Sequence, residues 1–171
     1  MEYGSDTVIG PHVRVILMDC FETLVQLTEH GYSARKGIER FIDHFATTRK
    51  IPLIVISDAP EAAIANALRQ AGLLNRIAGI YDTRSADKLP DSRARKRLDL
   101  PLKDMQLEAS MSVFIGDSQL DAQAAQFHGV PFIRVPRSED REFSFERLIS
   151  GPSRYRSGEF IVHLEQAYRL P

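Results

Sequence analysis

The feature that most constrains the fold is a short apolar run, Val13–Met18, that ends abruptly at an acidic residue, Asp19. A run of this length, rich in β-branched side chains, is typical of a strand buried inside a parallel sheet. Ligands of such sheets bind just beyond the carboxyl ends of the strands. Asp19 is therefore placed where a ligand would bind, although an acid in this position can also serve a turn.

Further apolar runs repeat this pattern, and segments with helical character separate them. The predicted strands after the first are Ile51–Ile56, Ile77–Tyr81, Met111–Ile115 and Pro131–Val135. The predicted helices are Ala34–Lys50, Pro60–Gln70, a basic helix Ser92–Leu98, and Gln119–His128, with a further turn or two in Pro101–Glu108. Phe21–Ser33 is predicted to form a small loop or hairpin, and Ala86–Asp91 a loop. This alternation predicts an α/β fold, a doubly wound, Rossmann-like three-layer sandwich with a mostly parallel five-stranded sheet.

The length of 171 residues predicts a single domain, 1–171, with its core at about 13–135. Met1–His12 is predicted to be an extended lead-in, and 136–171 a C-terminal extension that packs on the core. Within that extension Pro136–Ser157 is charged and loop-like, whereas Glu159–Leu170 has apolar residues at helical spacing.

The charge balance argues against binding to nucleic acid or to a membrane surface, because 22 Lys and Arg face 23 Asp and Glu. One cysteine excludes an internal disulfide and favours a reducing compartment. We find neither a leader segment nor an apolar run approaching the roughly 18 residues that a membrane span needs. The cytoplasm is the expected location.

Polar residues recur at the predicted strand ends or in the following loops. They are Asp19, Ser57, Lys88, and Asp117 with Asp121. The fold would bring them to one edge of the sheet, where Asp19 and Asp117 suffice to anchor Mg²⁺. Ser57 and Lys88 could then hold the oxygens of a phosphoryl group. Individually, each of these residues has a plainer explanation as a turn former, a helix-start acid or a solvated lysine.

Taken together, these stretches resemble the motifs of the haloacid dehalogenase superfamily of phosphohydrolases over about Val13 to Val135. Asp19-Cys20-Phe21-Glu22-Thr23 stands for the first motif, the Ser57 strand end for the second and Lys88-Leu89-Pro90 for the third. Gly116 to Pro131, GDSQLDAQAAQFHGVP, follows the fourth motif along its full length and is the specific one.

The resemblance implies a role for each of these residues. Asp19 would be the nucleophile, forming an aspartyl-phosphate, and a ligand of Mg²⁺. The backbone carbonyl of Phe21, together with Asp117 and Asp121, would complete the metal site. The residues that would bind the phosphoryl group and substrate are Ser57, Asp58, Lys88 and Thr23. Ser57 and Lys88 would also assist catalysis.

The sequence departs from the family pattern at Phe21, where phosphatases of the family carry a second Asp that protonates the leaving group. Glu22 is the nearest carboxylate, but it is one residue out of register. Three hypotheses therefore stand. The chain is a phosphatase with weak turnover, a binding or regulatory protein that keeps the metal site, or a hydrolase of a non-phosphate bond. The Mg²⁺ ligand set speaks against the third.

The spacing also predicts that no cap domain is present. The segments between Asp19 and Ser57, and between Ser57 and Lys88, hold little more than a helix with a loop or a short strand. Capless members of the family generally have open sites. The expected partner is thus a phosphorylated small molecule or macromolecule, with a lid borrowed from a second copy of the chain as an alternative.

Overall fold

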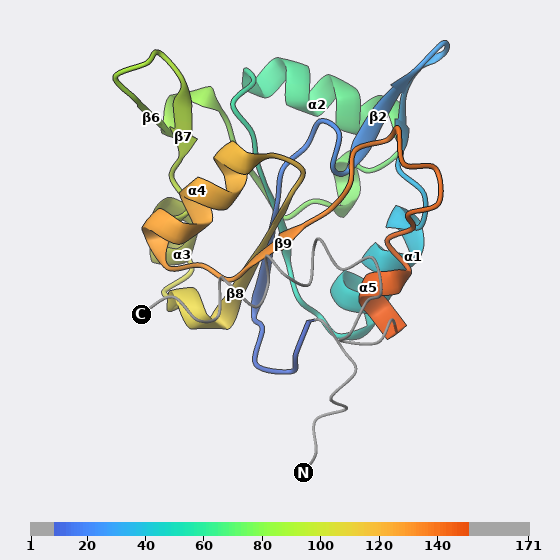
Figure 1. The fold of residues 1–171 in the computed structure, drawn as a ribbon. Helices are drawn as coiled ribbons and strands as arrows, with labels where there is room; N and C mark the ends of the chain where they lie inside the picture. The colour runs from blue at the N-terminus through green and yellow to red at the C-terminus, as the bar shows by residue number, and fades with distance from the viewer. Residues whose placement is uncertain (1–8, 151–171) are drawn as a thin grey trace.

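The computed structural model describes residues 9–150, and its centre is a sheet of five strands in the order β5-β4-β1-β8-β9 (Figure 1). The strands are β1 (Val15–Met18), β4 (Leu53–Ile56), β5 (Gly79–Tyr81), β8 (Ser112–Gly116) and β9 (Phe132–Arg134). Every neighbouring pair in this sheet is parallel. The predicted fold class is confirmed, and the carboxyl end of the central strand β1 lies at the middle of one sheet edge.

The two faces of the sheet carry separate apolar layers because side chains alternate along each strand. In β1, Ile16 and Met18 belong to one buried cluster, whereas Val15 and Leu17 belong to the other. The first face is covered by α1 (Ile38–Ile42), its π-helical continuation Asp43–Thr48, α2 (Glu61–Gln70) and α5 (Arg147–Ser150). The second is covered by α3 (Asp99–Asp104) and α4 (Gln119–His128). Short 3-10 turns occur at Leu74–Arg76, Thr83–Ser85 and Ala109–Met111.

An antiparallel hairpin, β2 (Val25–Thr28) and β3 (Gly31–Ala34), follows β1 and projects beyond the sheet edge (Figure 1). It confirms the hairpin alternative for the segment after Phe21. The helix predicted from Ala34 begins later, at Ile38, because Ala34 still pairs in β3. Gly37, just before the helix, takes a left-handed conformation with φ of 83°.

A second antiparallel hairpin, β6 (Ala86–Lys88) and β7 (Ala94–Lys96), replaces the predicted loop and the predicted basic helix Ser92–Leu98. That helix was wrong. The chain reverses at Ser92, whose φ is 69°, and the backbone N–H of Leu89 donates to the carbonyl of Arg93. The segment has one large apolar residue, Leu98, so it could not present the apolar stripe that stabilises a surface helix.

Beyond the sheet, the described part of the C-terminal region packs on the core through Phe143, Phe145 and Leu148, which are buried with the first-face cluster. Residues 1–8 of the lead-in and the predicted helical segment Glu159–Leu170 lie outside the described residues. No helix within residues 9–150 combines the length and the apolar character that crossing a bilayer requires.

Candidate active site at the carboxyl edge of the sheet

Asp19 lies at the carboxyl end of β1, at the start of a tight turn. Its backbone N–H donates to the carbonyl of Ile115 at 3.0 Å, which extends the pairing of β1 with β8. The carbonyl of Cys20 accepts from the N–H groups of Leu24 and Val25 at 2.9 and 3.1 Å, closing the turn. The Cys20 N–H donates back to Oδ1 of Asp19 at 2.9 Å, so the turn also orients the carboxylate.

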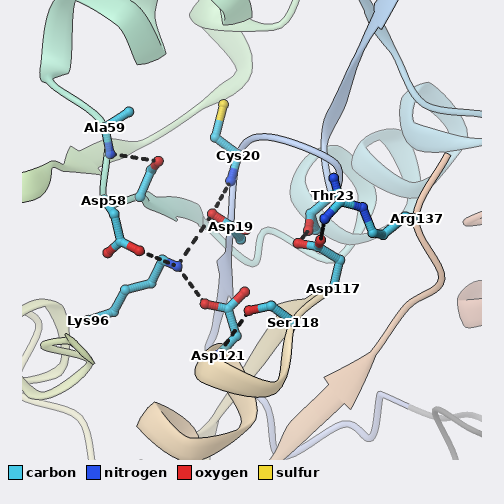
Figure 2. A network of polar contacts seen from close by, with 11 residues as sticks. Asp19, Cys20, Thr23, Asp58, Ala59, Lys96, Asp117, Ser118, Asp121 and Arg137 are labelled. Carbon is cyan, nitrogen blue, oxygen red and sulfur yellow. Dashed lines mark hydrogen bonds and ion pairs between the residues drawn. The ribbon is translucent and has the colours of Figure 1, made fainter. Parts of the chain in front are cut away.

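The second and third carboxylates come from the junction of β8 and α4. Ser118 caps α4 by accepting from the backbone N–H of Asp121 at 3.1 Å. Gly116 leaves room for the Asp121 side chain, since a Cβ there would lie 2.5 Å from its Oδ2. Carboxylate oxygens of Asp19, Asp117 and Asp121 all lie within 4.8 Å of one another (Figure 2). The predicted acids are thus brought together.

Thr23 fixes the position of Asp117. Its buried hydroxyl donates to Oδ1 of Asp117 at 3.1 Å, joining the turn after β1 to the loop after β8. Nη1 of Arg137, in the loop after β9, lies 3.8 Å from the other carboxylate oxygen of Asp117 (Figure 2). Asp117 is therefore held between the turn after β1 and the loop after β9.

The lysine of the site is Lys96 in β7, a residue that the sequence analysis did not select. Its buried ammonium lies 2.5 Å from Oδ1 of Asp121, 3.6 Å from Oδ1 of Asp19 and 3.5 Å from Oδ2 of Asp58. One cation therefore neutralises part of a cluster of carboxylates that would otherwise repel one another.

Lys88, the lysine predicted for the site, makes no ion pair with these carboxylates in the structure. Lys88 is exposed in β6 and pairs with Ala94, two residues before Lys96 on the opposite strand. The resemblance to a Lys-x-Pro motif selected the first strand of the hairpin, whereas the fold delivers the lysine of the second strand. Only the register of this hairpin, in which Ala86 pairs with Lys96, distinguishes the two lysines.

The charges of the cluster are only partly balanced. Burial, followed by the neighbouring Asp121, raises the pKa of Asp19 well above its usual range, although Lys96 opposes the shift. The pKa of Asp121 is raised as well, chiefly by burial. Burial alone would lower the pKa of Lys96, but Asp19, Asp121 and Asp58 together raise it. The site therefore holds more negative charge than its lysine compensates.

A divalent cation fits this arrangement. Oδ2 of Asp121 is buried and has no hydrogen-bond partner, and it belongs to a trio of oxygen ligands of the kind that Mg²⁺ prefers. The positive charge of such a cation, added to that of Lys96, would relieve the repulsion among the carboxylates that raises their pKa values. The residues that would hold the ion are Asp19, Asp117 and Asp121.

Ser57 and Asp58 lie at the end of β4, as predicted. Ser57 is buried, and its hydroxyl oxygen accepts from the N–H of Ala59 at 3.3 Å. Asp58 turns its Oδ2 toward Lys96, while its Oδ1 is buried without a hydrogen-bond partner. Their roles toward a phosphoryl group remain predictions.

Phe21 and Glu22 lie beside the site in different ways. The Phe21 ring packs edge-on against Tyr32 of the hairpin, with the ring centroids 5.4 Å apart. Glu22 has a left-handed φ of 59°, and its Oε2 accepts from the backbone N–H of Ser138 at 2.9 Å. Glu22 is therefore engaged with the loop after β9. Cys20 is buried, and burial raises the pKa of its thiol to about 12, so it stays protonated.

Two residues near the cluster, Lys96 and Arg137, were not predicted from the sequence. For Arg137 a signal existed, since it follows the predicted strand Pro131–Val135 and so occupies another carboxyl strand end. For Lys96 the sequence offers only its place before the buried Leu98 and α3, which is not specific.

Comparisons with known proteins agree with this fold. A family model described as haloacid dehalogenase-like hydrolase matches residues 13–135. A predicted phosphoglycolate phosphatase from Haemophilus somnus has a similar structure, with a TM-score of 0.61, 13% identity, and coverage of 75% of this chain and 91% of that one. A haloacid dehalogenase-like family protein from Streptococcus pneumoniae has a TM-score of 0.59, 13% identity and coverage of 72% and 84%. A superfamily hydrolase from Geobacter sulfurreducens has a TM-score of 0.56, 12% identity and coverage of 74% and 93%. No curated protein matches the sequence.

Proposed function

The chain belongs to the haloacid dehalogenase-like hydrolase family, and on this premise we propose that it is a Mg²⁺-dependent phosphohydrolase of phosphate monoesters. The observation that carries the proposal is the trio of Asp19, Asp117 and Asp121 within 4.8 Å, with Lys96 against two of them. A carboxylate beside a lysine and a divalent cation is a competent nucleophile toward phosphorus.

Asp19 performs the attack in this proposal. One of its carboxylate oxygens forms a bond to phosphorus as the bond to the alcohol oxygen breaks, which leaves an aspartyl-phosphate and an alkoxide that takes a proton. Water then attacks the phosphorus, restores the carboxylate and releases phosphate. Bound Mg²⁺ would supply positive charge to the phosphoryl oxygens. Lys96 adds a second charge, and Thr23 keeps Asp117 in place.

The proton for the leaving group is the weak point of this chemistry. Phe21 occupies the position from which family phosphatases deliver it, and a phenyl ring cannot carry a proton. Glu22 is engaged by Ser138 on the adjacent loop. General acid–base assistance is typically worth about 10²–10⁴ in rate, so turnover is expected to be slow and to favour leaving groups of low pKa.

The remaining predictions extend the proposal. Ser57, through its hydroxyl, and Asp58 would bind the phosphoryl group or the substrate at the end of β4. No cap domain is proposed, so the site would stay open to small or macromolecular phosphoesters unless a second copy of the chain covers it. The single cysteine favours a reducing compartment, so the proposed location is the cytoplasm. The balanced charge favours a partner other than nucleic acid or a membrane.

The test is phosphate release from a panel of phosphomonoesters, including p-nitrophenyl phosphate, phosphoglycolate and a phosphopeptide, with and without Mg²⁺. Asp19→Asn is the matched control, since it keeps the shape of the side chain and removes the nucleophile. Release that requires Mg²⁺ and disappears in the variant supports the proposal.

Phe21 gives the alternative function its specific support. A protein that binds Mg²⁺ and a phosphoryl group without turnover would be a binding or regulatory member of the family. Tight Mg²⁺ binding by calorimetry, combined with no phosphate release across the panel, would overturn the enzymatic proposal in favour of this alternative.

A further inference from the structure

A groove of about 430 Å³ lies between the β2–β3 hairpin and the loop after β9. In Figure 1 that loop, drawn in orange, runs beside the hairpin before the chain enters α5. The groove is lined by three cationic side chains, Arg35, Lys36 and Arg141, and one acidic one, Asp140. Its surroundings therefore favour a negatively charged ligand.

Arg35 is the unusual member of this lining, because it is only 4% exposed and yet has no carboxylate at ion-pair distance among residues 9–150. Its guanidinium lies 5.9 and 5.8 Å from the ring centres of Phe143 and Phe145. Nη1 donates to the backbone carbonyl of Glu22 at 2.7 Å. Burial is the largest influence on the pKa of this arginine and lowers it, whereas the charges of Glu22, Asp117 and Asp140, none of them at ion-pair distance, act in the opposite direction. An anion in direct contact would stabilise the buried guanidinium further.

Asp140, the acidic residue of the groove lining, makes no ion pair with Arg35. Its Oδ1 accepts from the backbone N–H groups of Glu142 and Phe143 at 3.0 and 3.2 Å, which commits it to the turn of the loop. Lys36 and Arg141 are exposed at the rim. The groove thus combines one buried guanidinium with two cations at its mouth, an arrangement that suits a carboxylate or phosphate.

The groove adjoins the catalytic turn. Arg35 binds the carbonyl of Glu22, and the N–H of Ser138, another groove residue, binds the Glu22 carboxylate. Glu22 lies three positions after Asp19 along the chain. The neighbour of Ser138, Arg137, reaches Asp117 in the metal cluster. The groove and the catalytic cluster are therefore connected through this turn and the loop after β9.

We propose that this groove binds a second anionic group of the substrate, remote from the scissile phosphate, with Arg35 as the principal contact. The inference rests on the proposed phosphohydrolase function and narrows its substrate class to phosphate monoesters that carry another negative charge. Arg35, Lys36 and Arg141 are then specificity-determining residues.

The experiment compares matched pairs of alkyl phosphates that end either in a carboxylate or in the corresponding carboxamide, over a series of chain lengths. Hydrogen bonds to charged groups support a preference of about tenfold or more in kcat/KM for the acid at the optimal length. Arg35→Met should bring the acid-to-amide ratio close to one. Since Arg35 also supports the Glu22 turn, Lys36→Gln/Arg141→Gln provides an independent variant, expected to lower the ratio about threefold or more.

The control is Arg69→Gln/Lys103→Gln, which removes the same charge from exposed positions of α2 and α3 and should leave the ratio unchanged. Equal kcat/KM values for acid and amide at every length would overturn the inference while leaving the phosphohydrolase function intact. An acid-to-amide ratio of kcat/KM that Lys36→Gln/Arg141→Gln leaves unchanged would also overturn the inference and leave the phosphohydrolase function intact.

A second measurement separates the two proposals. Calorimetry on Asp19→Asn with Mg²⁺ measures binding of the same acid and amide without turnover. If the native chain hydrolyses neither ester, the proposed function fails. Tighter binding of the acid that weakens in Lys36→Gln/Arg141→Gln would still support the anion groove, and equal binding or no binding would overturn it.

Discussion

The ammonium of Lys96 lies 2.5 Å from Oδ1 of Asp121, whereas Lys88, eight positions earlier, is exposed on the partner strand of the same hairpin. Lys96 is also 3.6 Å from the nucleophilic carboxylate of Asp19. Replacing it removes a positive charge from the reaction centre. We expect Lys96→Gln to lower kcat of the Mg²⁺-dependent phosphatase reaction by about 10²-fold or more, the usual effect of deleting one preorganised electrostatic contact.

Lys88→Gln is the matched control, because it makes the same chemical change two positions from Lys96 across the hairpin. Its kcat should remain within about twofold of the native value, as is usual for a surface substitution without close partners. Strong loss of activity in Lys88→Gln with little loss in Lys96→Gln would show that the hairpin register differs in the active protein.

The two lysines also show how far the sequence alone could predict this site. Asp19, Asp117 and Asp121 were predictable because each depends on local pattern: an apolar strand that ends in an acid, and an acid in the first turn of a capped helix. The five-stranded sheet was predictable for the same reason, since each of its strands lies in a short apolar run of the sequence.

Lys96 and Arg35 were not predictable in this way. The position of Lys96 depends on pairing between β6 and β7, and short polar strands without alternation give no periodic signal. Arg35 occurs in a segment predicted to be helical, and its burial depends on Phe143 and Phe145, more than a hundred positions later. Contacts of that range come from the tertiary fold.

Binding of Mg²⁺ should stabilise the folded protein. An ion present at 100 times its dissociation constant adds about 2.7 kcal/mol to the free energy of unfolding when it binds only the native state. We expect Mg²⁺ to raise the thermal midpoint and a chelator to reverse the change. Asp121→Asn should lose most of this shift, whereas Glu108→Gln, at an exposed position, should keep it. A full shift in both variants would place the ion elsewhere.

The raised pKa of Asp19 makes the stability of the metal-free protein depend on pH. Burial and the charge of Asp121 are the main causes, so the folded state binds a proton at Asp19 more tightly than the unfolded chain does. Ionised Asp19 therefore destabilises the fold at neutral pH, and this penalty declines as the pH falls through the raised pKa.

Asp19→Asn removes the penalty. Without divalent cations, the variant should be more stable than the native protein at neutral pH, and the difference should shrink toward about pH 4, the usual pKa of an unfolded aspartate. Urea unfolding across this range measures the difference. A difference that is independent of pH would contradict an elevated pKa at Asp19.

Gly116 is required for the approach of Asp121 to the end of β8. A Cβ at this position would lie 2.5 Å from Oδ2 and 2.9 Å from Cβ of Asp121, so the helix start would have to move. We expect Gly116→Ala to cost about 1–3 kcal/mol of stability and to weaken Mg²⁺ binding. Gly79→Ala is the control, since its Cβ would meet only the flexible end of Ile54 at 3.3 Å. Mg²⁺ affinity should distinguish the two even if their stabilities do not.

Phe21→Asp tests whether the missing acid limits turnover. The half-buried Phe21 ring packs on Tyr32, two positions from the nucleophile in the turn after β1. An aspartate here could protonate the leaving alcohol and then activate water against the aspartyl-phosphate. We expect kcat for alkyl phosphates, whose leaving groups are poor, to rise by about 10²-fold or more, and p-nitrophenyl phosphate to gain less because its leaving group needs less protonation. Phe21→Asn is the control, because asparagine has nearly the same shape as aspartate but cannot transfer the proton. It should show no such gain in kcat. Equal rates for the two variants and the native chain would mean that Phe21 serves a chemistry other than that of a disabled phosphatase.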